Sequence, residues 1–345
     1  MNALPRRKIR FAAACLAVAL TLPGAASARD QVRIVGSSTV FPFTATVAEH
    51  FAKSQSASRP VVESTGSGGG FKLFCAGLGD TTPDIAAASR RIGPRELENC
   101  AANSVTEIAE IFIGYDGIVL AGARPAPPPS LSRDQLFRAI AKTVPVGGKL
   151  VPNPYRRWKD IDPALPDREI MIFGPAPNHG TRDTLVALVM DKACAKSPEI
   201  RALAPEARRR ACQAVREDGA FIEVTESYQI AVKKLLLEPR AMAILPFSYM
   251  EQNLDRLDAA TLDGQAATFD NILSGAYPLS RPLFLYVKKA RLPVTLGLRQ
   301  YLDEFTAERA WGPGGYLADK GLVPLPDTVR RAEAAKAREL PNLVP

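Results

Sequence analysis

Short apolar runs alternate along the chain with stretches whose apolar residues recur at helical spacing. Phe43, Val47 and Phe51, for example, lie four residues apart and would share one face of a helix. This alternation predicts an α/β fold with mostly parallel sheets. The expected strands are Val32–Val35, Pro60–Glu63, Ile85–Ala88, Ile111–Ala121, Glu169–Phe173, Ala241–Leu245 and Leu283–Val287, and the expected helices are Phe43–Phe51, Asp183–Ala195, Tyr228–Leu237 and Thr328–Leu340.

Two long apolar strands suggest that the chain crosses between two parts of the protein. Ile111–Ala121 runs into the proline-rich segment Arg124–Ser130, and Pro282–Lys288 can return the chain. A length of 345 residues also fits about two domains. We therefore expect lobe 1 to be residues 29–120 plus 286–345, and lobe 2 to be residues 121–285.

Residues 1–28 have the pattern of a secretory signal peptide that is removed after export. Four basic residues precede the short apolar run Phe11–Leu22, and Ala26-Ser27-Ala28 is a small-x-small cleavage site. The run is short for a membrane span, so an N-terminal anchor is the less favoured alternative. Removing four basic and no acidic residues changes the net charge from +8 to +4 (8 − 4 = 4), which weakens any argument for nucleic-acid binding.

Four cysteines remain after the signal peptide: Cys75, Cys100, Cys194 and Cys212. An even count in an exported chain indicates disulfides, with three pairings open and free buried thiols as the alternative. The local pairing, Cys75–Cys100 and Cys194–Cys212, would close two short loops and contribute about 3 kcal/mol each. Two histidines and no His/Cys cluster at ligand spacing predict neither a metal site nor another cofactor.

Polar segments follow several of the expected strands and open the next helices. They are Gly36–Pro42, with Ser38 and Thr39; Thr65–Gly70, with Ser67; Asn178–Asp183, with Gly180, Thr181 and Arg182; and Ala88–Arg91, with Ser89 and Arg90. Each alone is explained by helix capping, a flexible turn or an exposed arginine. Together, helix N-termini, hydroxyls and arginines predict a site for a small tetrahedral oxyanion that needs no metal.

The same segments resemble the PstS family, the periplasmic phosphate-binding proteins of ABC importers. The matching residues run in order over almost the whole mature chain: Gly-Ser-Ser-Thr-Val-Phe-Pro (36–42), Thr-Gly-Ser-Gly-Gly-Gly (65–70), Asp-Ile-Ala-Ala-Ala-Ser-Arg-Arg (84–91), Gly-Thr-Arg-Asp (180–183) and Tyr-Pro-Leu-Ser-Arg-Pro-Leu-Phe-Leu-Tyr-Val (277–287). The resemblance implies a two-lobe type II periplasmic-binding-protein fold, in which each lobe is a mostly parallel sheet flanked by helices and two crossover strands join them.

The resemblance also implies a function and a set of site residues. A monomeric periplasmic protein would capture inorganic phosphate between its lobes and deliver it to a membrane ABC permease, without catalysis. The phosphate contacts carried over by position are Ser38, Thr39, Val40, Ser67, Gly68, Ser89, Arg90, His179, Gly180, Thr181 and Arg182.

Three positions depart from the family pattern. Arg90 replaces an Asp that accepts the proton of hydrogen phosphate, so selectivity against sulfate needs another carboxylate, for which Asp183 and Glu226 are the candidates. His179 replaces a Ser, and Pro175 stands where the family has a cleft arginine, which leaves Arg182 to compensate.

Three other functions remain open from the sequence. The same fold could bind a sulfate-like oxyanion, or act as a sensor or adhesion module. An exported serine hydrolase or phosphatase would use Ser67 with His179, but Ser67 lacks the first glycine of the Gly-x-Ser-x-Gly elbow.

Overall fold

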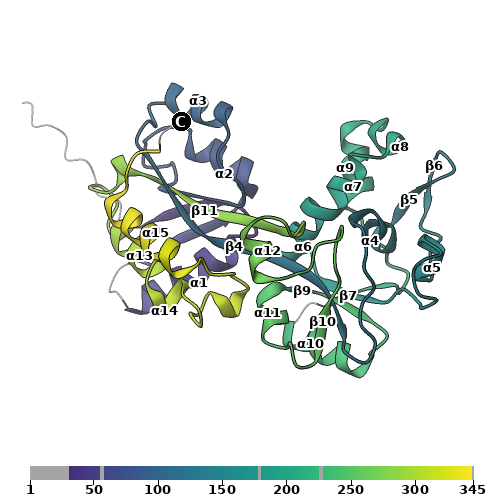
Figure 1. The fold of residues 1–345 in the computed structure, drawn as a ribbon. Helices are drawn as coiled ribbons and strands as arrows, with labels where there is room; N and C mark the ends of the chain where they lie inside the picture. The colour runs from purple at the N-terminus through teal and green to yellow at the C-terminus, as the bar shows by residue number, and fades with distance from the viewer. Residues whose placement is uncertain (1–30, 55–57, 178–179, 225–227, 344–345) are drawn as a thin grey trace, which may run out of the picture.

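The computed structural model describes residues 31–54, 58–177, 180–224 and 228–343, so the expected signal peptide lies outside the described residues. Two lobes lie side by side, and two long strands run between them (Figure 1). The strands are β1 (Arg33–Gly36), β2 (Val61–Ser64), β3 (Ile85–Ala88), β4 (Ile108–Ala123), β5 (Thr143–Val146), β6 (Lys149–Pro152), β7 (Ile172–Pro175), β8 (Phe221–Val224), β9 (Met242–Pro246), β10 (Leu257–Ala259) and β11 (Ser280–Lys288).

The strands of each lobe run parallel, as the alternating pattern predicts. β1 pairs in parallel with β2 and β3 in lobe 1, and β7 pairs in parallel with β8 and β9 in lobe 2. β4 and β11 join these groups with antiparallel pairing, in the order β2-β1-β3-β11-β4-β9-β7-β8 with β10 on β4, and β5 and β6 form a separate hairpin. The architecture is the two-lobe α/β fold with two crossover strands.

Helices flank both parallel groups (Figure 1). They are α1 (Phe41–Ser54), α2 (Gly66–Phe74), α3 (Pro94–Ala102), α4 (Arg133–Ile140), α5 (Trp158–Ile161), α6 (Gly180–Leu185), α7 (Asp191–Cys194), α8 (Pro198–Arg201), α9 (Pro205–Gln213), α10 (Tyr228–Leu237), α11 (Phe247–Glu251), α12 (Phe269–Leu273), α13 (Leu298–Phe305), α14 (Glu308–Trp311) and α15 (Asp327–Glu339), with the π-helical turn η1 (Val186–Met190) and the 3-10 turns η2 (Lys289–Arg291) and η3 (Ala318–Lys320). α15 packs on α13 and β4, so the expected C-terminal helix lies on lobe 1.

One local prediction is wrong: the glycine run after β2 is not a turn ahead of a helix but the first turns of α2 itself. The reason is close packing against the end of β1. A Cβ on Gly70 would lie 2.5 Å from the Cα of Gly36, and a Cβ on Gly36 would lie 2.0 Å from the carbonyl oxygen of Ala87. Only glycine allows this approach, which brings Ser67 next to β1 and β3.

The apolar cores divide along the crossover strands. Ile113 of β4 and Leu283 of β11 belong to a lobe 1 core, whereas Ile118 of β4 and Leu279 just before β11 belong to the lobe 2 core. The chain therefore crosses between these pairs of residues. The boundaries expected at residues 120 and 285 lie a few residues further along, and their exact placement remains a prediction.

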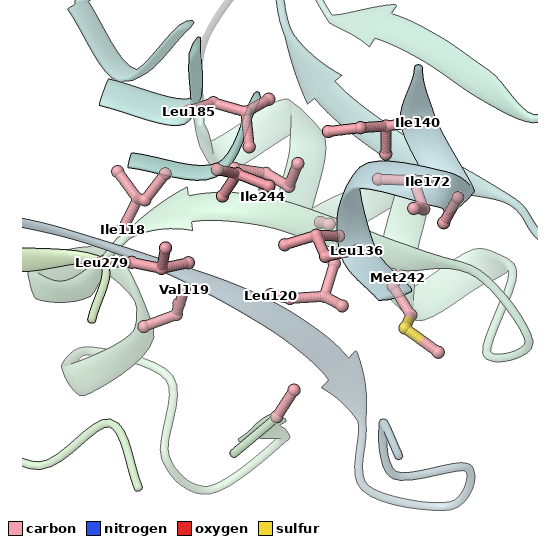
Figure 2. Close-up of a cluster of buried hydrophobic side chains, with 14 of the residues drawn as sticks. Ile118, Val119, Leu120, Leu136, Ile140, Ile172, Leu185, Met242, Ile244 and Leu279 are labelled. Carbon is pink, nitrogen blue, oxygen red and sulfur yellow. The ribbon is translucent and has the colours of Figure 1, made fainter. Parts of the chain in front are cut away.

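The lobe 2 core is built on the second half of β4. Figure 2 shows Ile118 and Leu120 of β4 with Ile140 of α4, Ile172 of β7 and Ile244 of β9. All five are at most 3% exposed, and full burial of such a side chain stabilises a fold by about 1.5–3 kcal/mol. This packing anchors the second half of β4 in lobe 2.

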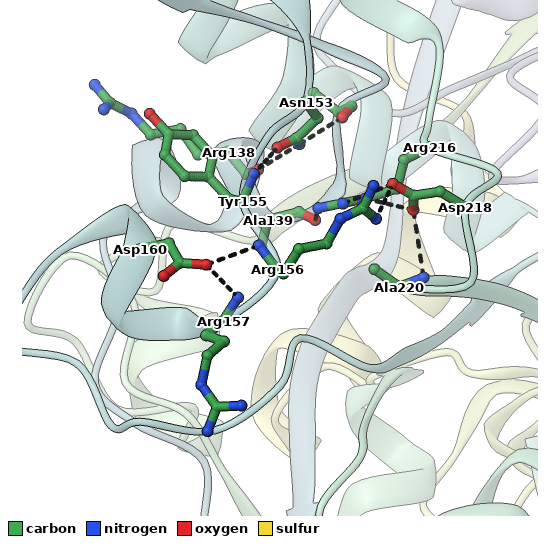
Figure 3. Close-up of polar contacts among 11 residues, drawn as sticks. Arg138, Ala139, Asn153, Tyr155, Arg156, Arg157, Asp160, Arg216, Asp218 and Ala220 are labelled. Atoms are coloured by element: carbon green, nitrogen blue, oxygen red, sulfur yellow. Dashed lines mark hydrogen bonds and ion pairs between the residues drawn. The ribbon is translucent and has the colours of Figure 1, made fainter.

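A polar network supports the start of β8 in lobe 2 (Figure 3). Buried Arg216 donates from Nε and Nη2 to the two carboxylate oxygens of Asp218, at 2.8 and 2.7 Å, and Arg156 donates to the same carboxylate at 2.5 Å. The hydrogen bonds from Arg216 are the main reason that the pKa of Asp218 lies well below its ordinary value.

Both expected disulfides are formed. Cys75 at the end of α2 bonds Cys100 of α3, and Cys194 of α7 bonds Cys212 of α9. Each therefore ties two helices within a single lobe. None of the described helices is long and apolar enough to cross a membrane.

Candidate functional site

Three serine hydroxyls meet where segments of lobe 1 converge. Ser37 follows β1, Ser67 lies in the first turn of α2, and Ser89 follows β3. The Oγ of Ser37 donates to the Oγ of Ser89 at 3.1 Å, and the Oγ atoms of Ser67 and Ser89 lie 3.4 Å apart. The close packing of Gly36 and Gly70 described above allows these contacts. The three hydroxyls form a row of neutral groups that can both donate and accept hydrogen bonds.

The loop that enters α1 continues this row toward lobe 2. The N–H of Thr39 donates to the Oγ of Ser37 at 3.2 Å, and Val40 is fully buried beneath it. Across the interface, a Cβ on Gly180 would lie 3.2 Å from the carbonyl oxygen of Ser38. The first residue of α6 in lobe 2 therefore packs directly against this loop of lobe 1.

Lobe 2 contributes hydroxyls from α6 and α10. Thr181 and Tyr228 share a hydrogen bond of 2.5 Å between their oxygens. Burial is the main cause that raises the pKa of Tyr228 to about 12, so the phenol is neutral at physiological pH. One helical turn from Thr181, Thr184 donates its hydroxyl to Oδ2 of Asp116 at 2.5 Å.

The centre of the site is formed by Asp116 of β4 and Arg281 of β11, which with Thr184 we call the crossing cluster. The two residues are direct partners in the antiparallel ladder, at the point where both strands pass between the lobes. Arg281 Nη2 donates to the hydroxyl of Thr39 in lobe 1 and to the hydroxyl of Thr184 in lobe 2, the latter at 2.6 Å. One guanidinium thus connects both lobes.

The electrostatics of Asp116 are set by burial. Its Oδ2 lies 3.4 Å from Arg281 Nε, and its side chain is 9% exposed. Loss of hydration raises the pKa of Asp116 above its ordinary value, and the charge of Arg281 opposes that shift only in part. Asp183 adds to the increase in the pKa, because its negative charge is close enough to repel that of Asp116.

The two arginines expected to bind the oxyanion have other partners. Arg90 donates from Nη1 and Nη2 to both oxygens of Glu96 at 2.8 Å, and its guanidinium lies 5.2 Å above the ring of Phe71. The hydrogen bond with Glu96 is the main reason that the pKa of Arg90 is raised. Arg90 nevertheless lies near the site, since a Cβ on Gly68 would be 3.8 Å from its Nη2.

Arg182 points into lobe 2 instead of joining the other site residues. Its Nη1 donates to the carbonyl oxygen of Pro175 at 2.7 Å and to Glu223 at 3.2 Å, and the guanidinium lies over the ring of Phe221. Burial lowers the pKa of Arg182. These contacts support the packing of β7 against β8 and do not favour the role of ligand, which remains a prediction.

The structure thus gathers most of the expected residues and adds three. Ser38, Thr39, Ser67, Ser89, Gly180 and Thr181 lie around one interface between the lobes, with Val40 beneath it and Gly68 and Arg90 beside it. His179 and Glu226 lie outside the described residues. Ser37, Asp116 and Arg281 were not predicted.

A signal for two of the missed residues is present in the sequence. Asp116 is a single acidic residue within the apolar run Ile111–Ala121, and Arg281 directly precedes the apolar run Pro282–Val287. Charged residues are rarely buried unless paired, so the two strands could have been searched for a pair. His50, the one histidine among the described residues, stacks on Tyr316 with ring centroids 3.9 Å apart.

Comparisons with known proteins agree on one type of fold. Residues 23–309 match the family of the PBP superfamily domain. The chain is 26% identical over 343 residues to Protein SphX of Synechococcus elongatus, across 97% of this chain and 90% of that protein. It is 27% identical over 314 residues to the phosphate-binding protein PstS of Staphylococcus haemolyticus, across 88% and 84%. The crystal structure of a possible phosphate binding protein from Planctomyces limnophilus has a TM-score of 0.70 at 24% identity, across 90% of this chain and 99% of that one.

Proposed function

This chain belongs to the PBP superfamily domain family, and from that membership we propose that it is an exported solute-binding protein for inorganic phosphate. The protein captures the anion between its lobes in the periplasm and delivers it to a membrane ABC permease. The phosphate-binding relative PstS, which aligns over most of the chain, supports this ligand. The signal pattern in residues 1–28 supports export.

The observation that carries the proposal is the set of donors that converges from both lobes. The hydroxyls of Ser37, Ser67 and Ser89 contact one another, and the N–H of Thr39 donates to the hydroxyl of Ser37. Arg281 donates to the hydroxyl of Thr39 and also to Thr184 of lobe 2. Hydroxyls, backbone N–H groups and a guanidinium are the donors that bind tetrahedral oxyanions. A guanidinium on a crossover strand suits a site that both lobes share.

In the proposed complex, lobe 1 and lobe 2 hold opposite sides of the phosphate. The contacts from lobe 1 are Ser38, Thr39, Ser67, Gly68 and Ser89, and those from lobe 2 are His179, Gly180 and Thr181. Arg281, rather than Arg182, is the main cation. A hinge at the crossover strands opens and closes the lobes around the ligand.

The test is calorimetric titration of ligand-stripped mature protein with phosphate and with sulfate. We expect tight phosphate binding that is weakened about tenfold by Thr39→Val, since that variant loses a hydrogen bond to Arg281. Thr295→Val is the matched control, because Thr295 bonds Asp84 inside lobe 1. If the wild type binds no phosphate, the proposal is wrong, and binding of sulfate alone would assign the sulfate-like alternative.

A further inference from the structure

The proposed function leaves open how the protein tells phosphate from sulfate. Both are tetrahedral anions, but hydrogen phosphate carries a proton that it can donate and sulfate carries none. Only an acceptor that cannot also donate separates the two, and an ionised carboxylate is such a group. The position that holds this carboxylate in the PstS family is Arg90 here, and Arg90 is paired with Glu96.

We infer that Asp116 accepts the hydrogen bond from the protonated oxygen of hydrogen phosphate and thereby excludes sulfate. This inference rests on the proposed function and assigns a specificity-determining residue to the same site. It differs from the two carboxylates that the sequence suggested, because Asp116 comes from a crossover strand and not from lobe 2.

The contacts of Asp116 leave one oxygen for a ligand. Both of its hydrogen-bond contacts, from Thr184 and from Arg281, are made by Oδ2. Among the described residues, none donates a hydrogen bond to Oδ1, and Oδ1 is not among the fully buried polar atoms without a partner. Thr184 and Arg281 thus hold the carboxylate in place while Oδ1 stays available.

The neighbours of Asp116 are also those expected beside a bound anion. Arg281 touches both Asp116 and the hydroxyl of Thr39, which the proposed function places on the phosphate. The side chains that contact Asp116 are Arg281 on β11 and Thr184 on α6, and Asp183 on α6 and Tyr228 on α10 interact with it through their charge. Arg281 offsets the repulsion between Asp116 and a bound anion, which lets a carboxylate serve in an anion site.

The alternative carboxylate on α6 is turned away from this cluster. Thr184 contacts Asp116 and Arg281, and successive residues of an α-helix are about 100° apart around the axis. Asp183 is therefore about 100° from the side of α6 that meets the crossing cluster. Asp183 still influences Asp116 through its charge, as its effect on the pKa shows.

The test compares phosphate with monofluorophosphate, in which fluorine replaces the hydroxyl. The two anions have the same shape and the same charge of −2 near pH 8, but fluorophosphate has no proton to donate. Sites built around a substrate hydroxyl reject analogues that lack it, because a buried acceptor is left unpaired. We expect the wild-type protein to bind phosphate at least about 100-fold more tightly than fluorophosphate or sulfate at pH 8.

Asp116→Asn should reduce the ratio of the phosphate and fluorophosphate affinities at least about tenfold, because an amide can donate to either anion. Asp183→Asn is the matched control and should leave the ratio unchanged. An unchanged ratio in Asp116→Asn, or a reduced ratio only in Asp183→Asn, would overturn the inference while phosphate binding by the wild type still supported the proposed function.

The wild-type measurement covers the case in which Asp116→Asn does not fold. Equal binding of phosphate and fluorophosphate by the wild type would by itself refute a proton-accepting carboxylate. If instead the wild type binds neither phosphate nor fluorophosphate, the proposed function fails as well. The two failures are therefore distinguishable in one set of titrations.

Discussion

Two buried clusters in this protein are built from the same three residue types. They are the lobe 1 cluster (Asp84, Arg291, Thr295) and the crossing cluster (Asp116, Arg281, Thr184). In the lobe 1 cluster, Oδ1 of Asp84 accepts from Arg291 and Thr295, and Oδ2 accepts from the N–H of Arg33 at 2.8 Å. Both carboxylate oxygens are used, and these three partners all belong to lobe 1.

The crossing cluster distributes its contacts differently. Toward the described residues Asp116 uses Oδ2 alone, and Arg281 donates to threonines of both lobes. The difference shows that chemical composition does not separate a structural ion pair from a functional one. What separates them is whether the polar groups are saturated within one lobe or shared across the interface between the two lobes.

The largest expected effect is on stability, at the lobe 1 cluster. Asp84→Ala removes the fully buried carboxylate partner of Arg291, and the remaining partner Asp80 is largely exposed. The loss of this buried ion pair should lower the free energy of unfolding by about 3–5 kcal/mol. Urea denaturation measures this change, and Asp84→Asn offers a milder variant. Phosphate affinity of the folded protein should change less than about twofold, and a tenfold loss of affinity at unchanged stability would contradict the comparison.

The next largest effect is on binding, at the crossing cluster. Arg281→Gln should weaken phosphate binding about 30-fold or more, because a charge-assisted hydrogen bond contributes about 1.5–3 kcal/mol. Calorimetry measures the affinity. Arg291→Gln is the matched control and should reduce stability without this loss. Equal losses of affinity in both variants would show that the two clusters do not differ in function.

The raised pKa of Asp116 in the crossing cluster should also be visible in the pH dependence of the unfolding free energy. Because burial raises the pKa of Asp116, the folded chain holds this proton more tightly than the unfolded chain does. The resulting stabilisation is complete below the unfolded pKa of about 3.9 and is lost as pH rises through the folded pKa. Without phosphate, the unfolding free energy of the wild type relative to Asp116→Asn should therefore fall from pH 4 to pH 7. A constant or rising difference would contradict the assignment.

The smallest effect is expected for Arg90, which the resemblance placed on the ligand. Its side chain is 49% exposed and its carboxylate partner is Glu96, so Arg90→Ala should cost at most about 1 kcal/mol of stability. Phosphate affinity should change less than about threefold. A loss of tenfold or more would restore Arg90 to the site and favour its role as a ligand.

The order of elements could be read from the sequence because it depends on local patterns. Apolar runs predicted β1, β2, β3, β7 and β9, and β4 and β11 were recognised as the crossover strands, whereas the short strands β5, β6, β8 and β10 were missed. The disulfides Cys75–Cys100 and Cys194–Cys212 followed from short sequence separations. The serine-bearing segments were found because each follows a strand and carries its own turn chemistry.

The assignment of charged side chains needed the tertiary structure. Four arginines, Arg90, Arg91, Arg182 and Arg281, lie in segments with the family pattern, and nothing local shows which one reaches both lobes. Arg281 meets Asp116 from 165 positions away and Thr39 from 242. Such contacts are set by the register of β11 on β4, and a shift of one residue would turn Arg281 to the opposite face of the sheet.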